Sequence, residues 1–275
     1  MSFDIQQFMS KKQDLEAFKK AHWTGSFQDY VNLVNDNPKI TRNAYQRLYD
    51  MIVSWGTEES IDTKKKINHY KFFEDPIDNG ADAVFGLDVP LMKLVNILHS
   101  AAKGYGPQNR VILLHGPVGS SKSTIARMLK KGLELYSKTD AGALYSFSWI
   151  NPDKEDIPVF RQLSELGLDE FPDPMNEEPL KLIPEAMRAG FIDEFCRGKT
   201  DSRIRIQGDL NPASRFFFTE LMKHYKGDWT RVIRHVKVRR LIFSEKDRIG
   251  LGTFQPKHEK NQDLSTTDRR PFIRL

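Results

Sequence analysis

Cysteine is almost absent from the 275-residue sequence, which contains only Cys196. A single cysteine cannot form a disulfide within the chain, and no set of cysteines and histidines has the spacing of a zinc site. Apolar runs are also short, because none approaches the roughly 18 residues that cross a bilayer. The first residues lack the basic and apolar regions of a secretory signal. We therefore expect a cytoplasmic protein with no structural metal and no membrane contact.

Charge is distributed unevenly along the chain, whose net charge is +5. Residues 151–200 contain 12 acidic and 6 basic side chains, whereas residues 201–275 contain 17 basic and 9 acidic ones. A basic surplus is typical of proteins that bind nucleic acid, but few aromatic residues accompany this one. We therefore interpret it as surface charge on separate parts of the molecule and do not expect a nucleic-acid partner. Phosphate binding and protein docking remain alternative explanations.

Residues 1–75 are predicted to form an N-terminal helical segment. Apolar residues recur at helical spacing from Phe27 to Val34 and from Tyr45 to Ile52, and Gly56 is expected to end the second helix. The polar stretch from Thr57 to Lys66 is predicted to be a loop or linker. No repeat of roughly 20–50 residues is present, which excludes solenoids and propellers.

An α/β unit is predicted to follow. Asp88 is a candidate N-cap of a helix that ends near Gly104. The apolar run 110–115 is typical of a buried parallel strand, and an amphipathic helix is predicted over 122–136. A second strand is predicted to begin near Phe147. The order strand, turn, helix, strand favours a parallel sheet flanked by helices.

The remaining part of the chain is predicted to be less regular at first. Residues 151–200 contain six prolines and are interpreted as an acidic insertion with short helices, such as one from Pro184 to Phe195. A helix is predicted from Phe216 to Tyr225 and a strand from His235 to Phe243.

Residues 116–123 read GPVGSSKS and lie between the predicted strand and the amphipathic helix. This is the phosphate-binding pattern G-x-x-x-x-G-K-[ST], with a serine in place of the second glycine. Glycines let backbone N–H groups face an anion, and a helix N-terminus adds positive potential. Lys122 is the predicted catalytic residue, which neutralises the β- and γ-phosphates, and Ser123 is predicted to hold Mg²⁺. The predicted ATP contacts are Gly116, Pro117, Val118, Gly119, Ser120, Ser121, Lys122, Ser123 and Thr124.

Ser121 stands where the pattern has its second glycine. A residue with a side chain is strained at positive φ, but a position next to a helix start is compatible with right-handed angles. We therefore expect Ser121 to adopt right-handed angles and the loop to remain able to bind phosphate. A purely structural glycine turn is the alternative.

Four longer blocks are more distinctive than the loop itself. They are LHGPVGSSKSTIARMLKKGLE (Leu114–Glu134), PMNEEPLKLIP (Pro174–Pro184), GDLNPASRFFF (Gly208–Phe218) and HVKVRRLIFSEKDRIGLGTFQPKHEKNQD (His235–Asp263). With these blocks the chain resembles the N-terminal AAA+ domain of PrkA-type serine protein kinases. The family's loop also has a serine at the position of Ser121. The resemblance covers most of the chain as far as Asp263 and is fainter over the first 80 residues.

The resemblance implies an AAA+ P-loop ATPase domain at 76–263, between the helical segment 1–75 and a divergent tail at 264–275. It also implies ATP and Mg²⁺ as cofactors, phosphoryl transfer to a serine of a protein substrate, and a ring-shaped homo-oligomer. Family members are well over twice as long, so we expect this chain to be the front part of such a protein. The Walker B strand, the sensors and the kinase-related region are then missing, and independent catalysis is in question. AAA+ domains place the adenine pocket upstream of the loop, which makes Phe85 and Gly86 candidates for it.

Other motifs have simpler explanations. Asp193 and Glu194 follow an apolar run, as in a Walker B strand, but fit better on a helix that continues from Pro184. Glu245 is a second candidate for a metal-binding carboxylate, with a surface charge at a strand end as the alternative. Gly250-Leu-Gly252 lacks the third glycine and the other motifs of protein kinases, and Cys196 has no indicated partner. A solvated strand edge explains the basic set better than an arginine finger does; the set is Arg231, Arg234, Lys237, Arg239 and Arg240.

Two further functions are compatible with the same loop. The first is an AAA+ ATPase that remodels or degrades proteins without kinase activity, which predicts ATP hydrolysis without phosphorylated protein. The second is a truncated module that binds ATP and turns nothing over.

Overall fold

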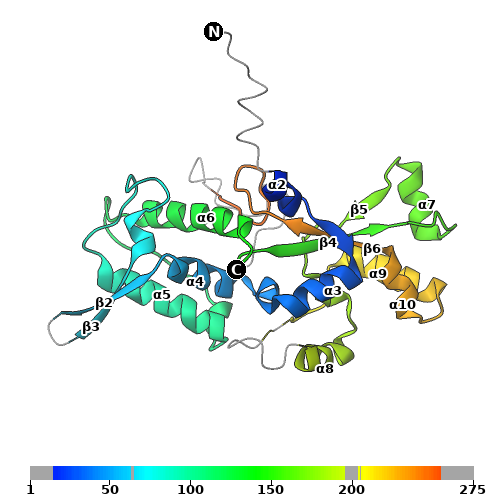
Figure 1. The fold of residues 1–275 in the computed structure, drawn as a ribbon, viewed down its shortest axis with the longest axis horizontal. Coiled ribbons are helices and arrows are strands. Elements are labelled where there is room, and N and C mark those ends of the chain that lie inside the picture. The colour runs from blue at the N-terminus through cyan, green and yellow to red at the C-terminus, as the bar shows by residue number, and fades with distance from the viewer. Residues whose placement is uncertain (1–14, 63–64, 196–203, 205, 255–275) are drawn as a thin grey trace, which may run out of the picture. The chain divides into compact units, whose positions relative to one another are not determined.

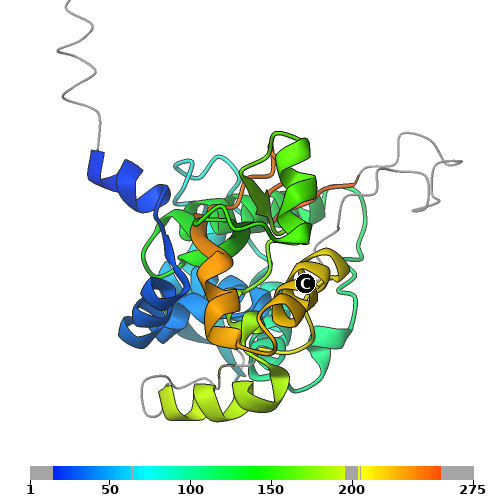
Figure 2. The ribbon, with the colours of Figure 1, turned by 90° about the vertical axis from the view of Figure 1, so that its right-hand side faces the viewer.

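The computed structural model describes residues 15–62, 65–195, 204 and 206–254, and its ribbon is drawn from two directions in Figure 1 and Figure 2. The chain divides into two compact units. Unit 1 consists of Met1–Asn32, Tyr145–Leu182 and Gly208–Leu241. Unit 2 consists of Leu33–Leu144, Ile183–Gln207 and Ile242–Leu275. Each unit is therefore assembled from three separate stretches of the chain.

Unit 1 is organised around a four-stranded sheet in the order β1-β6-β4-β5 (Figure 1). Its strands are β1 (Thr24–Ser26), β6 (Val236–Leu241), β4 (Leu144–Ile150) and β5 (Glu170–Pro172). β4 and β6 confirm the strands predicted near Phe147 and at 235–243. The chain therefore combines helices with a sheet, as expected for the α/β class.

The predicted parallel arrangement is wrong for the strand pairs of this sheet whose direction is defined. β1 runs antiparallel to β6, and β4 runs antiparallel to β5. Between β4 and β5 the chain forms the short helix α7 (Pro158–Glu165) and then turns at Gly167, whose φ is 69°. This return brings β5 back antiparallel to β4, whereas parallel pairing requires a complete crossover.

Aromatic side chains from β4, β5 and α9 (Pro212–His224) fill the core of unit 1. Trp149 on β4 is fully buried, and its ring stacks on Phe217 of α9 at a centroid distance of 5.9 Å. Phe171 of β5 stacks on the same phenylalanine at 4.8 Å. α9 starts before the predicted 216–225 helix because Asn211 caps it and Pro212 occupies its first turn.

Unit 2 is built on three helices that confirm the predicted ones. They are α4 (Ala44–Ser54), α5 (Asp88–Lys103) and α6 (Lys122–Lys138). Gly132 of α6 lies against the core side chains Met51 and Phe72, and a Cβ on it would come within 2.7 Å of each. Only glycine therefore lets α6 approach this closely. Gly104 ends α5 in the left-handed conformation, as predicted, but Leu87, not Asp88, is the N-cap residue.

The remaining helices are short. α3 (Phe27–Asp36) confirms the first predicted N-terminal helix, and α8 (Glu185–Phe195) confirms the helix predicted from Pro184. The others are α2 (Leu15–Ala21), α10 (Trp229–Val232), η1 (Pro38–Thr41), η2 (Lys71–Glu74), η3 (Pro107–Asn109), η4 (Pro179–Leu182) and η5 (Ile233–His235).

The predicted loop from Thr57 to Lys66 is wrong, because most of this stretch forms strands of an antiparallel hairpin. The strands are β2 (Thr57–Asp62) and β3 (Lys65–Tyr70). Acidic residues of β2 meet basic residues of β3, because Glu58 lies opposite His69 and Glu59 forms an ion pair with Lys66. Opposite charges at facing positions favour the pairing, and burial of Ile67 and Tyr70 anchors β3. Because the stretch is polar, its composition gave no indication of β3, which is partly buried.

The buried strand predicted at 110–115 is also wrong. The segment has no assigned strand, and Val111 and Leu113 are 94% and 82% exposed. Ile112 and Leu114 pack partly against the core of unit 2. Within the described residues no strand pairs with this segment, so alternate side chains face the solvent while the others reach the core.

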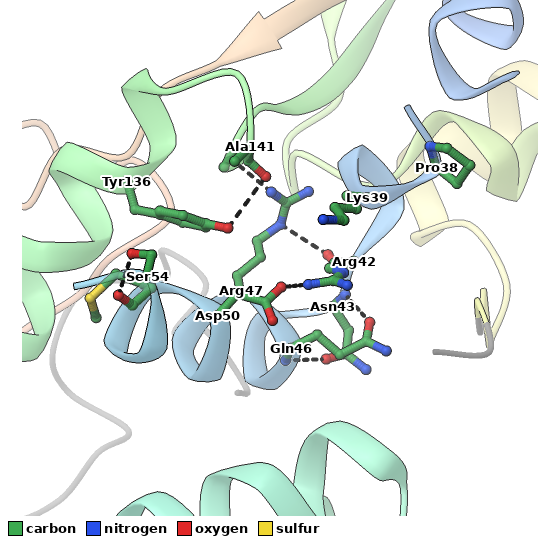
Figure 3. Close-up of polar contacts among 12 residues, drawn as sticks. Pro38, Lys39, Arg42, Asn43, Gln46, Arg47, Asp50, Ser54, Tyr136 and Ala141 are labelled. Carbon is green, nitrogen blue, oxygen red and sulfur yellow. Dashed lines mark hydrogen bonds and ion pairs between the residues drawn. The ribbon is translucent and has the colours of Figure 1, made fainter. Parts of the chain in front are cut away.

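Arg47 of α4 joins three parts of unit 2 through its buried guanidinium group (Figure 3). It donates hydrogen bonds to the carbonyl oxygens of Arg42 at 2.9 Å and of Gly142 and Ala143 at 2.8 Å, and also to that of Ile40. Loss of this side chain would leave several carbonyl groups without their donor, so we interpret Arg47 as a structural centre of the unit.

Candidate functional site

The phosphate-binding pattern forms a loop that leads directly into α6. Residues 117–119 are exposed, and Gly119 has a φ of 83°. Ser121 has φ 56° and ψ 14°, so the expectation of right-handed angles is wrong. The left-handed turn is needed because the chain changes direction here, and the Ser121 carbonyl accepts the first helical bond, from the N–H of Ile125 at 2.9 Å. The serine occupies a conformation that suits the glycine of the usual pattern.

Lys122, the first residue of α6, folds back over the loop. Its Nζ donates hydrogen bonds to the Gly116 carbonyl at 2.8 Å, to Ser120 Oγ at 2.9 Å and to the Pro117 carbonyl. Ser120 Oγ in turn donates to the Pro117 carbonyl at 2.8 Å. The side chains of Lys122 and Ser120 and the backbone of 116–117 therefore form one connected group at the N-terminus of a 17-residue helix.

This arrangement has the chemistry of an anion site. The first N–H groups of a helix lack partners within it, and the helix dipole adds positive potential at the same end. Ser123 and Thr124 follow Lys122 in the first turn of α6, and Ser123 is exposed. The loop therefore offers N–H groups, an ammonium group and hydroxyl groups to a ligand rich in oxygen acceptors.

A magnesium ion fits this set of donors only together with phosphate. In the described part of the chain, no group of three or more His, Cys, Asp or Glu side chains is suited to hold a metal ion. Mg²⁺ is commonly bound through a few protein oxygens and the phosphates of the substrate, and Ser123 could supply one such oxygen.

Neither candidate Walker B carboxylate lies in a metal-binding arrangement. Asp193 and Glu194 are exposed residues of α8, as the helical interpretation expected. Glu245 accepts hydrogen bonds from Lys130 Nζ and Thr253 Oγ1, and these bonds lower the pKa of its carboxyl group. Lys130 is eight residues after Lys122, which places this contact about 12 Å further along α6.

The other motifs are engaged in local structure. A Cβ on Gly250 would come within 2.0 Å of the Phe243 ring, so this glycine serves the packing of its loop. In unit 1, Arg231 lies over the Tyr225 ring at 4.3 Å, and Lys237 forms an ion pair with Glu170 at 2.8 Å. Cys196 and residues 255–275 lie outside the described residues.

Residues 75–82, which no sequence motif indicated, are attached to the solvent-facing side of α6. Arg127 donates to both carboxylate oxygens of Asp82, with Nε 2.8 Å from Oδ2, and this contact lowers the pKa of Asp82. Lys131, one turn further, forms an ion pair with Asp78. The buried carboxylate of Asp75 accepts the backbone N–H groups of Asp78 and Asp82 and shapes this segment. The sequence contained one indication of this contact. Two basic residues stand at i and i+4 on the predicted helix, and three aspartates lie within residues 75–82.

The segment leads to the two candidate adenine contacts. Phe85 is 80% exposed and Gly86 has a φ of 71°. Next along the chain, Asp88 at the start of α5 accepts from His69 Nδ1 at 2.6 Å, while His69 Nε2 lies 2.8 Å from Glu74. These carboxylates raise the pKa of His69. The imidazolium thus holds β3 against the first turn of α5.

In unit 1, two of the distinctive sequence blocks meet in a buried polar network. The carboxylate of Asp173 accepts hydrogen bonds from Asn211 Nδ2 and Ser214 Oγ and from the N–H groups of Met175 and Glu177. Asp173 is 2% exposed, and the side chain of Glu177 also accepts from Asn211. Each donor named here is satisfied within the network, so we interpret it as the cap of α9 and not as a binding site.

A second group of hydrogen-bonded side chains lies at the C-terminal end of α9. The Tyr225 hydroxyl lies 2.8 Å from Glu155 Oε2 and 2.7 Å from His235 Nε2, and His235 Nδ1 lies 3.0 Å from the Ile150 carbonyl. Burial raises the pKa of Tyr225 to about 12 and lowers that of His235.

Within the described part of the chain, no helix has the length and apolar character that a membrane span requires.

Comparison with known proteins identifies relatives over nearly the whole chain. Residues 25–268 match the family described as the PrkA AAA domain. The ATP-dependent protease PrkA of Bacillus subtilis (strain 168) is 36% identical over 263 residues, which are 95% of this chain and 34% of that protein. The serine/threonine kinase YeaG of Escherichia coli (strain K12) is 25% identical over 127 residues, 45% of this chain and 19% of that protein. No solved structure matches the chain significantly.

A shorter relative is matched over almost its full length. An uncharacterized protein from the gldA 5' region of Geobacillus stearothermophilus is 34% identical over 109 residues, which are 39% of this chain and 99% of that protein. The chain spans about a third of the length of the Bacillus subtilis relative. The family match includes the phosphate loop, α6 and the buried network around Asp173, and on this basis the chain belongs to the PrkA AAA domain family.

Proposed function

We propose that the chain binds ATP with Mg²⁺ at residues 116–124. The observation that carries the proposal is the position of Lys122, whose ammonium group lies among loop oxygens at the start of α6. A lysine at a glycine-containing loop before a helix is the usual arrangement for binding the β- and γ-phosphates. Membership of an AAA family supports ATP as the ligand.

Each residue has a specific part in this proposal. The backbone N–H groups of 118–121 and of the first turn of α6 surround the phosphates, and Lys122 neutralises their charge. Ser123 supplies a hydroxyl oxygen for Mg²⁺, and Thr124 adds a second hydroxyl next to it. Mg²⁺, when bound, would neutralise charge on the phosphate oxygens.

For the longer protein we propose an ATP-dependent reaction on a protein substrate. One candidate is phosphoryl transfer from ATP to a serine, which is supported by the resemblance to PrkA-type kinases and by the relative named serine/threonine kinase YeaG. The ring-shaped homo-oligomer belongs to this proposal on the same family grounds.

A second candidate is ATP-driven proteolysis or remodelling of a protein. It is favoured by the Bacillus subtilis relative, which is named an ATP-dependent protease and is matched over 95% of this chain. Both candidates need ATP at the same loop, and they differ in the product that is formed from the protein substrate.

Calorimetry of MgATP binding to the 275-residue chain tests the site itself. We expect Lys122→Ala to weaken binding at least about 100-fold, because the charge on the phosphates loses its partner. Lys93→Ala removes an exposed lysine in α5 and is the matched control, expected to bind as the parent does. Equal binding by all three proteins, each shown to be folded, would contradict the proposed site.

Radiolabelled ATP and a generic protein substrate such as casein separate the two candidate reactions. Transfer of the γ-phosphate to the protein supports the kinase, whereas release of free phosphate together with peptides supports the protease. Binding without either product identifies this chain as a module that requires the rest of a longer protein.

A further inference from the structure

The ammonium group of Lys122 is fully engaged by the loop to which it belongs. Its three partners are the carbonyl oxygens of Gly116 and Pro117 and the hydroxyl oxygen of Ser120. An ammonium group has three N–H donors, so these contacts account for all of them. A phosphate oxygen can therefore receive a full hydrogen bond from Lys122 only when one of these partners is released.

Ser120 supplies the one partner of the three that is a side-chain group. Its hydroxyl hydrogen points to the Pro117 carbonyl at 2.8 Å, which directs the lone pairs of the oxygen toward Lys122 Nζ at 2.9 Å. The two carbonyl oxygens belong to the backbone and remain as long as the loop keeps its path. The Ser120 contact is therefore the one that can be removed without changing the backbone.

Gly116 leaves the room that this contact needs. A Cβ at position 116 would lie 2.8 Å from Ser120 Oγ and 4.0 Å from Lys122 Nζ. The first glycine of the pattern thus permits the hydroxyl and the ammonium group to meet beside the backbone, in addition to any close approach of phosphate.

We propose that Ser120 is a positioning residue that holds Lys122 inside the loop and competes with the triphosphate for its ammonium group. The inference rests on the proposed function. On binding, a phosphate oxygen takes the place of Ser120 Oγ at Lys122 Nζ, while the Ser120 hydroxyl keeps its hydrogen bond to Pro117. The hydroxyl of Ser120 thus lowers the affinity of the site and slows entry of the nucleotide.

The test compares Ser120→Ala with Ser120→Thr in the 275-residue chain. Kd is measured by calorimetry for inorganic tripolyphosphate and for MgATP, and the association rate is measured by stopped flow with a fluorescent ATP analogue. We expect Ser120→Ala to lower both Kd values about three- to tenfold and to raise the association rate, which is the range for loss of one hydrogen bond. Ser120→Thr keeps a hydroxyl group and is expected to bind as the parent chain does. Ser120→Cys, a weaker acceptor, should lie between them.

The outcomes separate this inference from the function on which it rests. Unchanged or weaker binding by Ser120→Ala and Ser120→Cys, with circular dichroism like that of the parent chain, overturns the role of Ser120 and leaves the ATP site standing. Tighter binding by Ser120→Thr as well as by Ser120→Ala also overturns it, because the hydroxyl would then be irrelevant. Absence of triphosphate binding by the parent chain and all variants overturns both.

Discussion

The phosphate loop and the network around Asp173 both include residues of the distinctive sequence blocks, but they differ in burial and in what their contacts achieve. Lys122 and Ser120 bond to an exposed loop, where a released donor can turn to water or to a ligand. Asp173 is 2% exposed, and it holds the buried Ser214 and the partly buried Asn211 at the start of α9. Polar contacts thus occur in an exposed loop, for which we propose ligand binding, and in a buried cap that serves folding, and burial distinguishes the two.

Asp173→Ala gives the largest expected effect on stability. The substitution leaves the buried hydroxyl of Ser214 without its acceptor and removes the acceptor of three partly buried donors, on Asn211 and on two backbone N–H groups, so we expect a loss of about 3 kcal/mol in the free energy of unfolding. Urea denaturation followed by circular dichroism measures it. Asp153→Ala, at an exposed position after β4, is the control and should change the stability by less than about 0.5 kcal/mol. Equal effects of the two substitutions would mean that the network around Asp173 contributes no more to stability than an exposed carboxylate does.

His69→Gln tests an intermediate case, in which a partly exposed histidine joins two carboxylates. Because Asp88 and Glu74 raise the pKa of His69, its folded form binds a proton more tightly than its unfolded form. Its contribution is therefore complete below a pH of about 6.5 and is lost as the pH rises through the raised pKa. We expect His69→Gln to lower the free energy of unfolding by up to about 1 kcal/mol at pH 6. The loss should be smaller at a pH above the raised pKa of His69.

Denaturation series between pH 5.5 and 9 measure this difference. His99→Gln, which removes a histidine that stacks on Tyr49, is the control for the loss of an imidazole ring without an ion pair. A difference between the parent chain and His69→Gln that stays constant over the whole series would show that the two carboxylates do not act through a proton on His69.

Ser121→Gly is expected to have the smallest effect. At φ 56° a serine is strained by about 1 kcal/mol, and glycine removes this strain but gains entropy in the unfolded chain. We expect a net stabilisation of about 0.5 kcal/mol or less, detectable as a small rise in Tm. Ser123→Gly lies one position inside α6 and should instead destabilise the chain. A loss of stability in both variants would mean that the left-handed turn at Ser121 is not strained.

Most helices were predictable from spacing alone. α4, α5 and α6 each carry a stripe of apolar residues that a helix brings to one face, and Gly104 marks the end of α5. The helix from Pro184 was predictable as well, although its moderate apolar pattern gave no indication of how exposed it is. Local geometry decides such elements, because a helix forms its hydrogen bonds within its own segment.

Strands and loop angles were predicted less well. The hairpin of β2 and β3 pairs polar and charged residues, such as Glu58 with His69, which have no periodic apolar signature. The apolar run 110–115 has the composition of a buried strand but no assigned strand partner in the described residues. Ser121 stands at the second glycine of the pattern, and this position predicts left-handed angles. Its place next to the helix start predicted right-handed angles, which is wrong.

The sequence by itself determined the order of the helices, the place of Lys122 at a helix start and the family to which the chain belongs, because each depends on residues that are neighbours along the chain. Tertiary structure decided which strands pair, how the segment at Asp78 and Asp82 attaches to α6, and that Asp173 and Ser214 share a buried hydrogen bond. These contacts join residues that are far apart in the sequence. Their energy depends on burial and on the direction of approach, which no local pattern specifies.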